Sequence, residues 1–226
     1  MGAALVHATL PSSLPIFPLP GVLLLPRGRL PLNIFEPRYL AMTEDALKAD
    51  RLIGMIQPED PEASLAPNPG RPQPAVYRVG CAGRMTEFRE TDDERYLITL
   101  TGVGRFRIAA ELALDARGYR RVKADWSSFA GDLAEPAQRP GRFDRKPLLA
   151  ALRTFFDRRG LSANWGAVES ASDDALVTAL AMACPFEPRE KQALLECAGL
   201  TERAQVLLGL LTIGAAGPAL ADAKPQ

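Results

Sequence analysis

Histidine is nearly absent from this chain, in which His7 is the only one among 226 residues. A Ser-His-Asp or Cys-His catalytic centre needs an imidazole held in an ordered site. His7 lies in an N-terminal stretch where no helix or strand is predicted. Zinc sites draw on histidines or on paired cysteines, and the sequence has no Cys-x-x-Cys. We therefore predict no catalytic residue of these kinds, no metal site and no cofactor.

Cysteine is scarce as well, and its three positions follow no pattern: Cys81, Cys184 and Cys197. A predicted helix separates Cys184 from Cys197, and its rise of about 1.5 Å per residue puts them too far apart for a disulfide. An odd number of unpatterned cysteines is typical of a reducing compartment. We expect three small core side chains and a cytoplasmic protein.

Long hydrophobic runs are missing. The longest, residues 206–217, has about a dozen residues and contains Thr212 and three glycines, whereas a bilayer crossing takes roughly 20. The first dozen residues have neither the positive start nor the apolar stretch of a secretory signal. We expect neither a membrane span nor export.

Phosphate-binding motifs and an excess of charge are also lacking. Lysine plus arginine and aspartate plus glutamate both number 27, which favours no anionic partner. A P-loop needs Gly-Lys followed by Ser or Thr, and no lysine here precedes either residue. Gly102 and Gly104 begin a dinucleotide fingerprint, but Arg107 stands where its third glycine belongs. The chain is predicted not to be an enzyme.

Proline is abundant in residues 14–39, and this stretch is the most informative part of the sequence. Each proline removes a backbone donor and prevents a continuous helix, so the apolar residues between them indicate short strands with prolines at edges and ends. Pro37 then suits the first turn of a helix. The prolines before it are Pro15, Pro18, Pro20, Pro26 and Pro31.

The rest of the first half is also rich in predicted strands. Residues 51–57 form a short apolar run, and residues 75–110 and 119–126 alternate between apolar and polar side chains. Residues 58–74 hold six prolines and no periodicity, which predicts a long surface loop. Whether that loop is a binding lid or a passive insertion stays open.

The second half changes to helical periodicity. We predict a helix from Pro147 to Gly160, a second capped by Ser172, a third from Pro188 and a fourth capped by Thr201. The predicted organisation is a β-rich lobe at residues 1–126, a linker at 127–146, a helical lobe at 147–213 and a flexible tail at 214–226. This corresponds to an α+β fold.

Three segments resemble the N-terminal, substrate-binding domain of the Lon proteases: residues 14–39, 76–108 and 173–196. The likeness is greatest to stand-alone bacterial proteins made of that domain, and more distant to the Lon-like part of cereblon. It implies a PUA-like pseudobarrel with one inserted helix, followed by a helical bundle. It further implies a non-catalytic module that recognises polypeptides, alone or as an adaptor for a protease or chaperone. The ATPase and the Ser-Lys protease of Lon belong to other domains.

Four apolar residues of the β-rich lobe are the candidate polypeptide-binding residues: Phe35, Tyr39, Met85 and Phe88. Aromatic side chains give contact area at low entropic cost, and we expect these four on one face, where the β-rich lobe meets the helical lobe. The alternative is that they fill the core.

Arg105 lies between two apolar strand residues, Val103 and Phe106. An arginine there faces solvent or is buried with a carboxylate partner, because an unpaired buried charge is costly. Glu36 is the predicted partner, in a structural ion pair.

RNA binding is the alternative function, because PUA-like folds elsewhere bind RNA. Basic residues gather at 117–123 and 139–146, but the neutral overall charge counts against a nucleic-acid surface.

Overall fold

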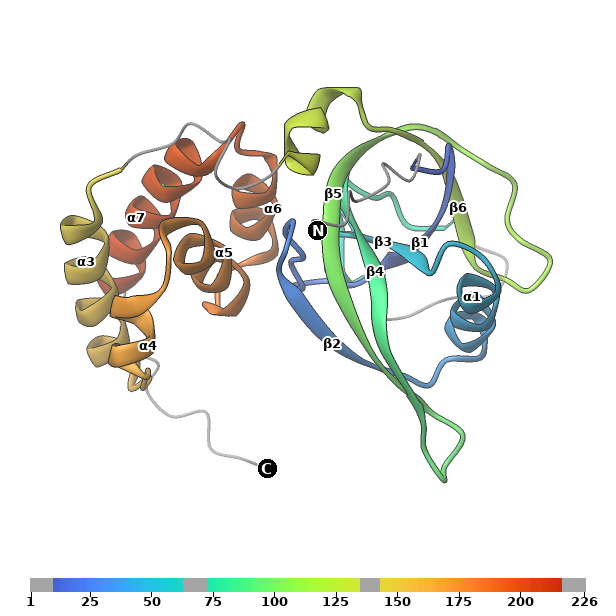
Figure 1. The fold of residues 1–226 in the computed structure, drawn as a ribbon, viewed down its shortest axis with the longest axis horizontal. Helices are drawn as coiled ribbons and strands as arrows, with labels where there is room; N and C mark the ends of the chain where they lie inside the picture. The colour runs from blue at the N-terminus through green and yellow to red at the C-terminus, as the bar shows by residue number, and fades with distance from the viewer. Residues whose placement is uncertain (1–9, 63–72, 135–142, 217–226) are drawn as a thin grey trace, which may run out of the picture.

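The computed structural model describes residues 10–62, 73–134 and 143–216. Two lobes lie side by side, one built on a six-stranded sheet and the other made of helices (Figure 1). The sheet lobe precedes the helical lobe along the chain. The predicted α+β fold is confirmed.

Five strands close into a barrel: β1 (Ser13–Pro18), β3 (Leu52–Ile56), β4 (Val79–Glu90), β5 (Tyr96–Glu111) and β6 (Arg120–Asp125). Neighbours pair antiparallel except β1 and β3, which run parallel. Pro15 and Pro18 fit inside β1 because the partners are staggered. Pro15 pairs only with β6, and Pro18 only with β3.

The sixth strand, β2 (Arg29–Ile34), lies outside this ring on β5. The long β5 pairs with β2 over Tyr96–Thr101 and with β6 over Arg107–Glu111, while β4 occupies its other edge. Within the described residues, β2 has a strand neighbour on one side only. Pro31, at its centre, has no N–H, which suits a strand with one free edge.

Helix α1 (Pro37–Lys48) follows β2 and begins at Pro37, as predicted. Its inner face places Tyr39, Met42 and Ala46 in the core. After β3, the predicted long loop starts with Pro58, which bridges to Val76, but residues 63–72 lie outside the described ranges. Its nature therefore stays a prediction.

The helical lobe contains α3 (Arg145–Arg159), α4 (Trp165–Ser170), α5 (Asp173–Ala183), α6 (Pro188–Glu196) and α7 (Leu200–Ala216). Gly160 ends α3 in the left-handed region at φ 62°, and the Ser172 hydroxyl accepts the Ala175 N–H at 3.4 Å to cap α5. Both predictions are confirmed. Thr201 is not a cap, because α7 already begins at Leu200. The short α4 was not predicted.

The stretch predicted to be a linker contains a 3₁₀ helix, η1 (Ser127–Leu133), which packs against β5. Residues 135–142 of that stretch, and residues 217–226 of the predicted tail, lie outside the described ranges. The boundaries of the four predicted segments remain predictions.

One apolar core extends through both lobes. It joins Leu24, Ile34 and Met85 of the β-rich lobe with Leu152 and Leu207 of the helical lobe. A smaller cluster around the fully buried Phe106 fills the barrel. No helix in the described parts of the chain combines the length and apolar character needed to cross a bilayer.

Candidate functional site

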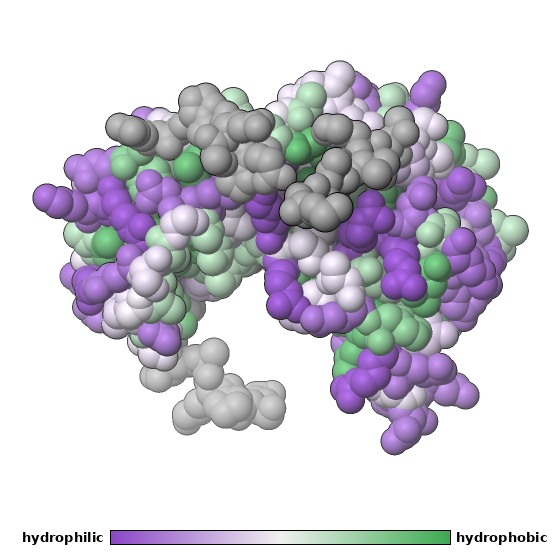
Figure 2. All heavy atoms as spheres, in the orientation of Figure 1, coloured by the Kyte–Doolittle hydropathy of each residue, from purple (hydrophilic) through white to green (hydrophobic). Residues whose placement is uncertain are grey.

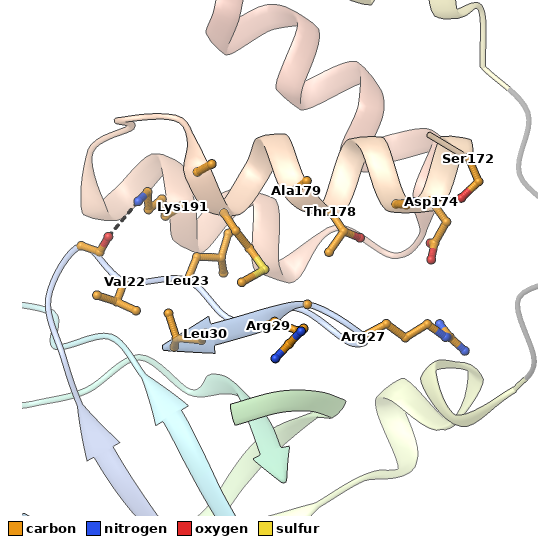
Figure 3. A pocket seen from close by; sticks show the side chains of 15 residues that line it. Val22, Leu23, Arg27, Arg29, Leu30, Ser172, Asp174, Thr178, Ala179 and Lys191 are labelled. Carbon is orange, nitrogen blue, oxygen red and sulfur yellow. Dashed lines mark hydrogen bonds between the residues drawn. The ribbon is translucent and has the colours of Figure 1, made fainter. Parts of the chain in front are cut away.

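A groove with a volume of about 660 Å³ lies between the two lobes (Figure 3). Figure 2 shows the surface hollowed here, with hydrophobic residues on the side of the helical lobe. One wall comes from the β1–β2 connection and the start of β2, and the other from α5 and one residue of α6. The lining residues are Gly21, Val22, Leu23, Arg27, Gly28, Arg29, Leu30, Ser172, Asp174, Ala175, Thr178, Ala179, Met182, Ala183 and Lys191.

The wall of the β-rich lobe is shaped by a tight turn just before β2. The Gly28 N–H donates to the Leu25 carbonyl at 2.9 Å, and Arg27 has a positive φ of 66°. The Arg27 N–H donates to the Gly102 carbonyl at 2.7 Å, which fixes the turn to β5. A Cβ on Gly28 would lie 2.3 Å from the Met182 sulfur. Glycine at this position therefore lets α5 approach β2 closely.

The opposite wall is an uncharged face of α5. Ala175, Ala179 and Ala183 are exposed and four residues apart, so they form one stripe along the helix. Leu176 and Leu180 are buried on the other side. No charged residue occurs between Asp174 and Glu187. A helix that is apolar all round is normally buried, and this signal in the sequence could have identified the groove.

Helix α6 joins the two walls at one end of the groove. The Lys191 ammonium donates to the Gly21 carbonyl at 2.8 Å (Figure 3). The Gly21 N–H donates to Gln57 Oε1 at 3.1 Å, and Gln57 Nε2 donates to the Pro188 carbonyl at 2.8 Å. Three hydrogen bonds thus hold the β1–β2 connection against the start of α6. Burial lowers the pKa of Lys191, because the charged form loses hydration.

The remaining charged groups of the groove, apart from Lys191, lie toward its other end and at its rim. Arg29 forms an exposed ion pair with Glu87, and Arg27 Nη2 donates to the Ala134 carbonyl at 2.5 Å. Asp174 lies in the first turn of α5. An apolar floor with a polar rim is the usual character of a surface that binds polypeptides.

Arg105 is buried with a carboxylate partner, but that partner is Asp132 and not the predicted Glu36. Its Nε and Nη2 donate to Asp132 at 2.8 and 3.0 Å, and its Nη1 donates to the Leu195 carbonyl at 2.9 Å. Glu36 instead forms an ion pair with Arg38 at 2.8 Å, two residues along the chain. The prediction failed because η1, which carries Asp132, could not be foreseen in a stretch without periodicity. Arg105 thus connects β5, η1 and the end of α6.

The four candidate binding residues do not form one exposed face. Tyr39 is 6% exposed, with its ring 4.1 Å from that of Phe17, and Met85 is 2% exposed, so both belong to the core. Phe35 and Phe88 are 61% and 40% exposed. None of the four lines the groove between the lobes. The alternative that these residues fill the core holds for Tyr39 and Met85.

The hairpin of β4 and β5 projects from the barrel (Figure 1). Phe88 lies near the end of β4, and Phe35 directly follows β2, whose last residue Ile34 pairs with Tyr96 at the start of β5. The Phe88 ring centroid is 5.0 Å from that of Tyr96, and the Arg95 guanidinium lies 5.8 Å from the centre of the Phe35 ring. Phe88 also lines a smaller hollow of about 490 Å³ across β2, β5 and β4. Their role in binding stays a prediction.

The cysteines are buried and free, as predicted. Burial raises the pKa of Cys184 to about 11 and also raises the pKa values of Cys81 and Cys197. These thiols are therefore protonated at neutral pH, and they are poor nucleophiles and poor metal ligands. Over the residues that the structure describes, no three His, Cys, Asp or Glu side chains cluster as a metal site requires.

A small barrel joined to a helical lobe, with a groove between them, defines a two-lobed α+β domain. The sequence model of the ATP-dependent protease La (LON) substrate-binding domain matches residues 13–212. The chain belongs to this family, and the resemblance to it is confirmed.

Solved structures share the fold. A Lon N-terminal domain protein from Xanthomonas campestris superimposes with a TM-score of 0.58 at 22% identity, covering 87% of this chain and 97% of that one. The N-terminal domain of the Mycobacterium avium complex Lon protease superimposes with a TM-score of 0.58 at 15% identity. This match covers 88% of this chain and 98% of that domain.

Relatives by sequence are much longer proteins. "Lon protease 2" of Sorangium cellulosum is 28% identical over 125 residues, which is 54% of this chain and 15% of the relative. "Lon protease 2" of Myxococcus xanthus is 28% identical over 121 residues, which is 51% of this chain and 13% of the relative. The similarity therefore concerns a small part of those proteases.

Proposed function

We propose that this protein is a non-catalytic recognition module that binds polypeptide segments in the groove between its lobes. The observation that carries the proposal is the apolar wall of α5, which faces Val22 and Leu30 across an open groove. Unfolded segments expose apolar side chains, and burying them is favourable by roughly 25 cal/mol per Å². The membership in a substrate-binding family supports the same partner class.

The groove suits an extended chain. Small alanine side chains on α5 leave room beside the free edge of β2, and the backbone of that edge can pair with an added strand. Pro31 offers an acceptor but no donor, so the pairing is incomplete and the apolar contacts supply most of the affinity. Such a site selects a type of segment and not one sequence.

An adaptor role follows from this binding. A module that captures exposed apolar segments, with no chemistry of its own, can deliver them to a protease or a chaperone. The purified protein is expected to hydrolyse no ATP and to cleave no casein. ATP turnover by clean material that disappears on a point substitution in this chain would contradict the proposal.

The binding test uses a fluorescent peptide of about eight residues, in which leucine alternates with serine. At about 3.3 Å per residue it is longer than β2. Ala179→Arg places a long charged side chain in the groove without weakening the helix, and the dissociation constant measured by fluorescence anisotropy should rise about ten-fold or more. Ala150→Arg, at an exposed position of α3 outside the groove, should bind like the wild type.

Phe88→Asp tests the other candidate surface. If Phe88→Asp abolishes binding and Ala179→Arg does not, the site is the hairpin and not the groove. A wild-type protein that binds no peptide would refute the proposal as a whole.

RNA binding, the alternative function, has less support. Arg117 pairs with Glu44 and Asp45, Arg120 with Glu111, and Arg121 with Asp115. These arginines are thus already engaged by carboxylates and are less available for phosphates. Any RNA complex should weaken steeply with salt if the contacts are to phosphate, and a salt-titrated mobility shift assay measures this.

A further inference from the structure

Lys191 is a buried cation at the end of the groove. The residue is 8% exposed, and its ammonium donates one hydrogen bond, to the Gly21 carbonyl at 2.8 Å. An ammonium has three donors. Among the described residues, no carboxylate lies within ion-pair distance of it. A buried charge without a counter-charge is costly. An anionic partner that accepts the remaining N–H groups of the ammonium would reduce this cost.

Other buried cations of the protein have acidic partners or lie away from the groove. Arg105 pairs with Asp132, and Arg120 with Glu111. Arg203 donates to the Leu194 carbonyl and does not line the groove. Lys191 differs from them because it combines burial, the lack of a described carboxylate partner and a position in the groove wall.

The surroundings of Lys191 indicate which kind of ligand group would pair with its ammonium. Val22 lies beside Lys191 (Figure 3), and α5 has no charged residue from Ala175 to its last residue, Ala183. The bond between Lys191 and Gly21 joins the two walls here (Figure 3), so a chain lying in the groove meets a bridge at this end. A segment that ends at the bridge presents its terminal carboxylate to the ammonium. A segment that continues has to turn out of the groove.

We propose that Lys191 binds the C-terminal carboxylate of the polypeptide, so that the groove recognises extended apolar segments at the end of a chain. One N–H of the ammonium stays on the Gly21 carbonyl, and the others donate to the carboxylate oxygens. The apolar surroundings strengthen this charge-assisted contact. The inference rests on the proposed polypeptide binding and adds the chemistry of its anchor.

The test compares two peptides of the same Leu/Ser sequence, one with a free C-terminal carboxylate and one with a C-terminal amide. The wild type should bind the acid about ten-fold more tightly than the amide. Lys191→Met keeps the apolar stem and removes the charge, so it should bind both peptides with the affinity of the amide. Lys123→Met, at an exposed position of β6, should keep the preference.

Two further measurements keep the result interpretable. Thermal unfolding checks that Lys191→Met is folded, and Lys191→Arg, which keeps the charge, should retain a preference for the acid. An amidated peptide with one internal aspartate should bind no better than the plain amide.

The outcomes separate the two proposals. Equal binding of acid and amide by the wild type overturns the role of Lys191 and leaves polypeptide binding in place, whereas binding of neither peptide refutes both. An amidated aspartate peptide that binds like the acid overturns recognition of the chain end. A protein that sediments as a dimer, and loses the dimer in Lys191→Met, makes a second copy the occupant instead.

Discussion

Arg105 and Asp132 form a buried ion pair, with the Arg105 Nε 2.8 Å from Asp132 Oδ2 and side-chain exposures of 3% and 8%. The same guanidinium donates to the carbonyls of Leu195 and Cys197 at the end of α6. The C-terminal end of a helix carries partial negative charge, so the cation stabilises that end as well. The Arg105 side chain therefore links the β-rich lobe to the helical lobe.

Asp132→Asn should lower the free energy of unfolding by about 3–5 kcal/mol, because it leaves a buried guanidinium without a counter-charge. Urea denaturation measures the change. Asp93→Asn breaks the exposed pair between Asp93 and Arg95 and should lower the free energy of unfolding far less, because water screens that pair. Equal effects of the two substitutions would show that burial of the first pair is unimportant.

Two glycines of α7 should respond oppositely to alanine. A Cβ on Gly209 meets nothing within 4 Å, so Gly209→Ala should raise the free energy of unfolding by about 0.5–1 kcal/mol through helix propensity. A Cβ on Gly214 lies 2.6 Å from the Phe155 ring, so Gly214→Ala should be destabilising. Thermal unfolding of both variants measures these changes in stability. A more stable Gly214→Ala variant would mean that the Phe155 ring moves freely out of the way.

Gly28→Ala and Gly102→Ala should differ in severity. The Cβ on Gly28 meets the flexible Met182, and the removal of that side chain in Met182→Ala should restore most of the lost stability. The Cβ on Gly102 lies 2.0 Å from the Leu25 carbonyl oxygen, a backbone atom that cannot turn aside. Gly102→Ala should therefore be the more damaging, and no single side-chain deletion should rescue it. A double-mutant cycle in urea tests both statements.

Stability should fall as the pH rises above 10. Burial, the largest cause, raises the pKa of Tyr39 to about 12 from 10.0, so the unfolded chain loses this proton first and unfolding is favoured between these values. The expected loss from this group is about 2 kcal/mol by pH 11.5. Below pH 10 the contribution of Tyr39 to the free energy of unfolding does not change with pH.

Tyr39→Phe should unfold with a shallower dependence on alkaline pH than the wild type. Tyr119, whose pKa is also raised to about 12, should keep part of the slope in that variant. Urea titrations between pH 8 and 11.5 measure both curves. Identical slopes would show that Tyr39 titrates normally in the folded protein.

Local signals in the sequence predicted much of the fold. Ser172, Gly160 and Pro188 mark helix boundaries through backbone geometry and capping, which depend on neighbours in the chain. The prolines of residues 14–39 likewise excluded a helix and left two strands. The parallel pairing of β1 with β3 was not predictable in this way, because it depends on how distant segments meet.

The candidate site was harder to predict for the same reason. Alternation in a strand shows which residues share a face, but not how far a neighbouring layer covers it. Met85 lies under that cover, whereas Phe88 lies three residues further along β4, beyond a register shift, where the hairpin projects. The physical rule that a buried Arg105 needs a carboxylate was correct, but the choice of Glu36 relied on proximity that only the fold decides.

The pairing of β5 with three other strands has a consequence for the chain during synthesis. The barrel cannot close before β6 has left the ribosome, because β6 connects β1 with the far end of β5. Asp132 follows shortly after β6, so Arg105 can be neutralised before any residue of α6 exists. The helical lobe then emerges next to a finished barrel. In that barrel the Arg105 guanidinium is already positioned to donate to the carbonyls of Leu195 and Cys197 at the end of α6.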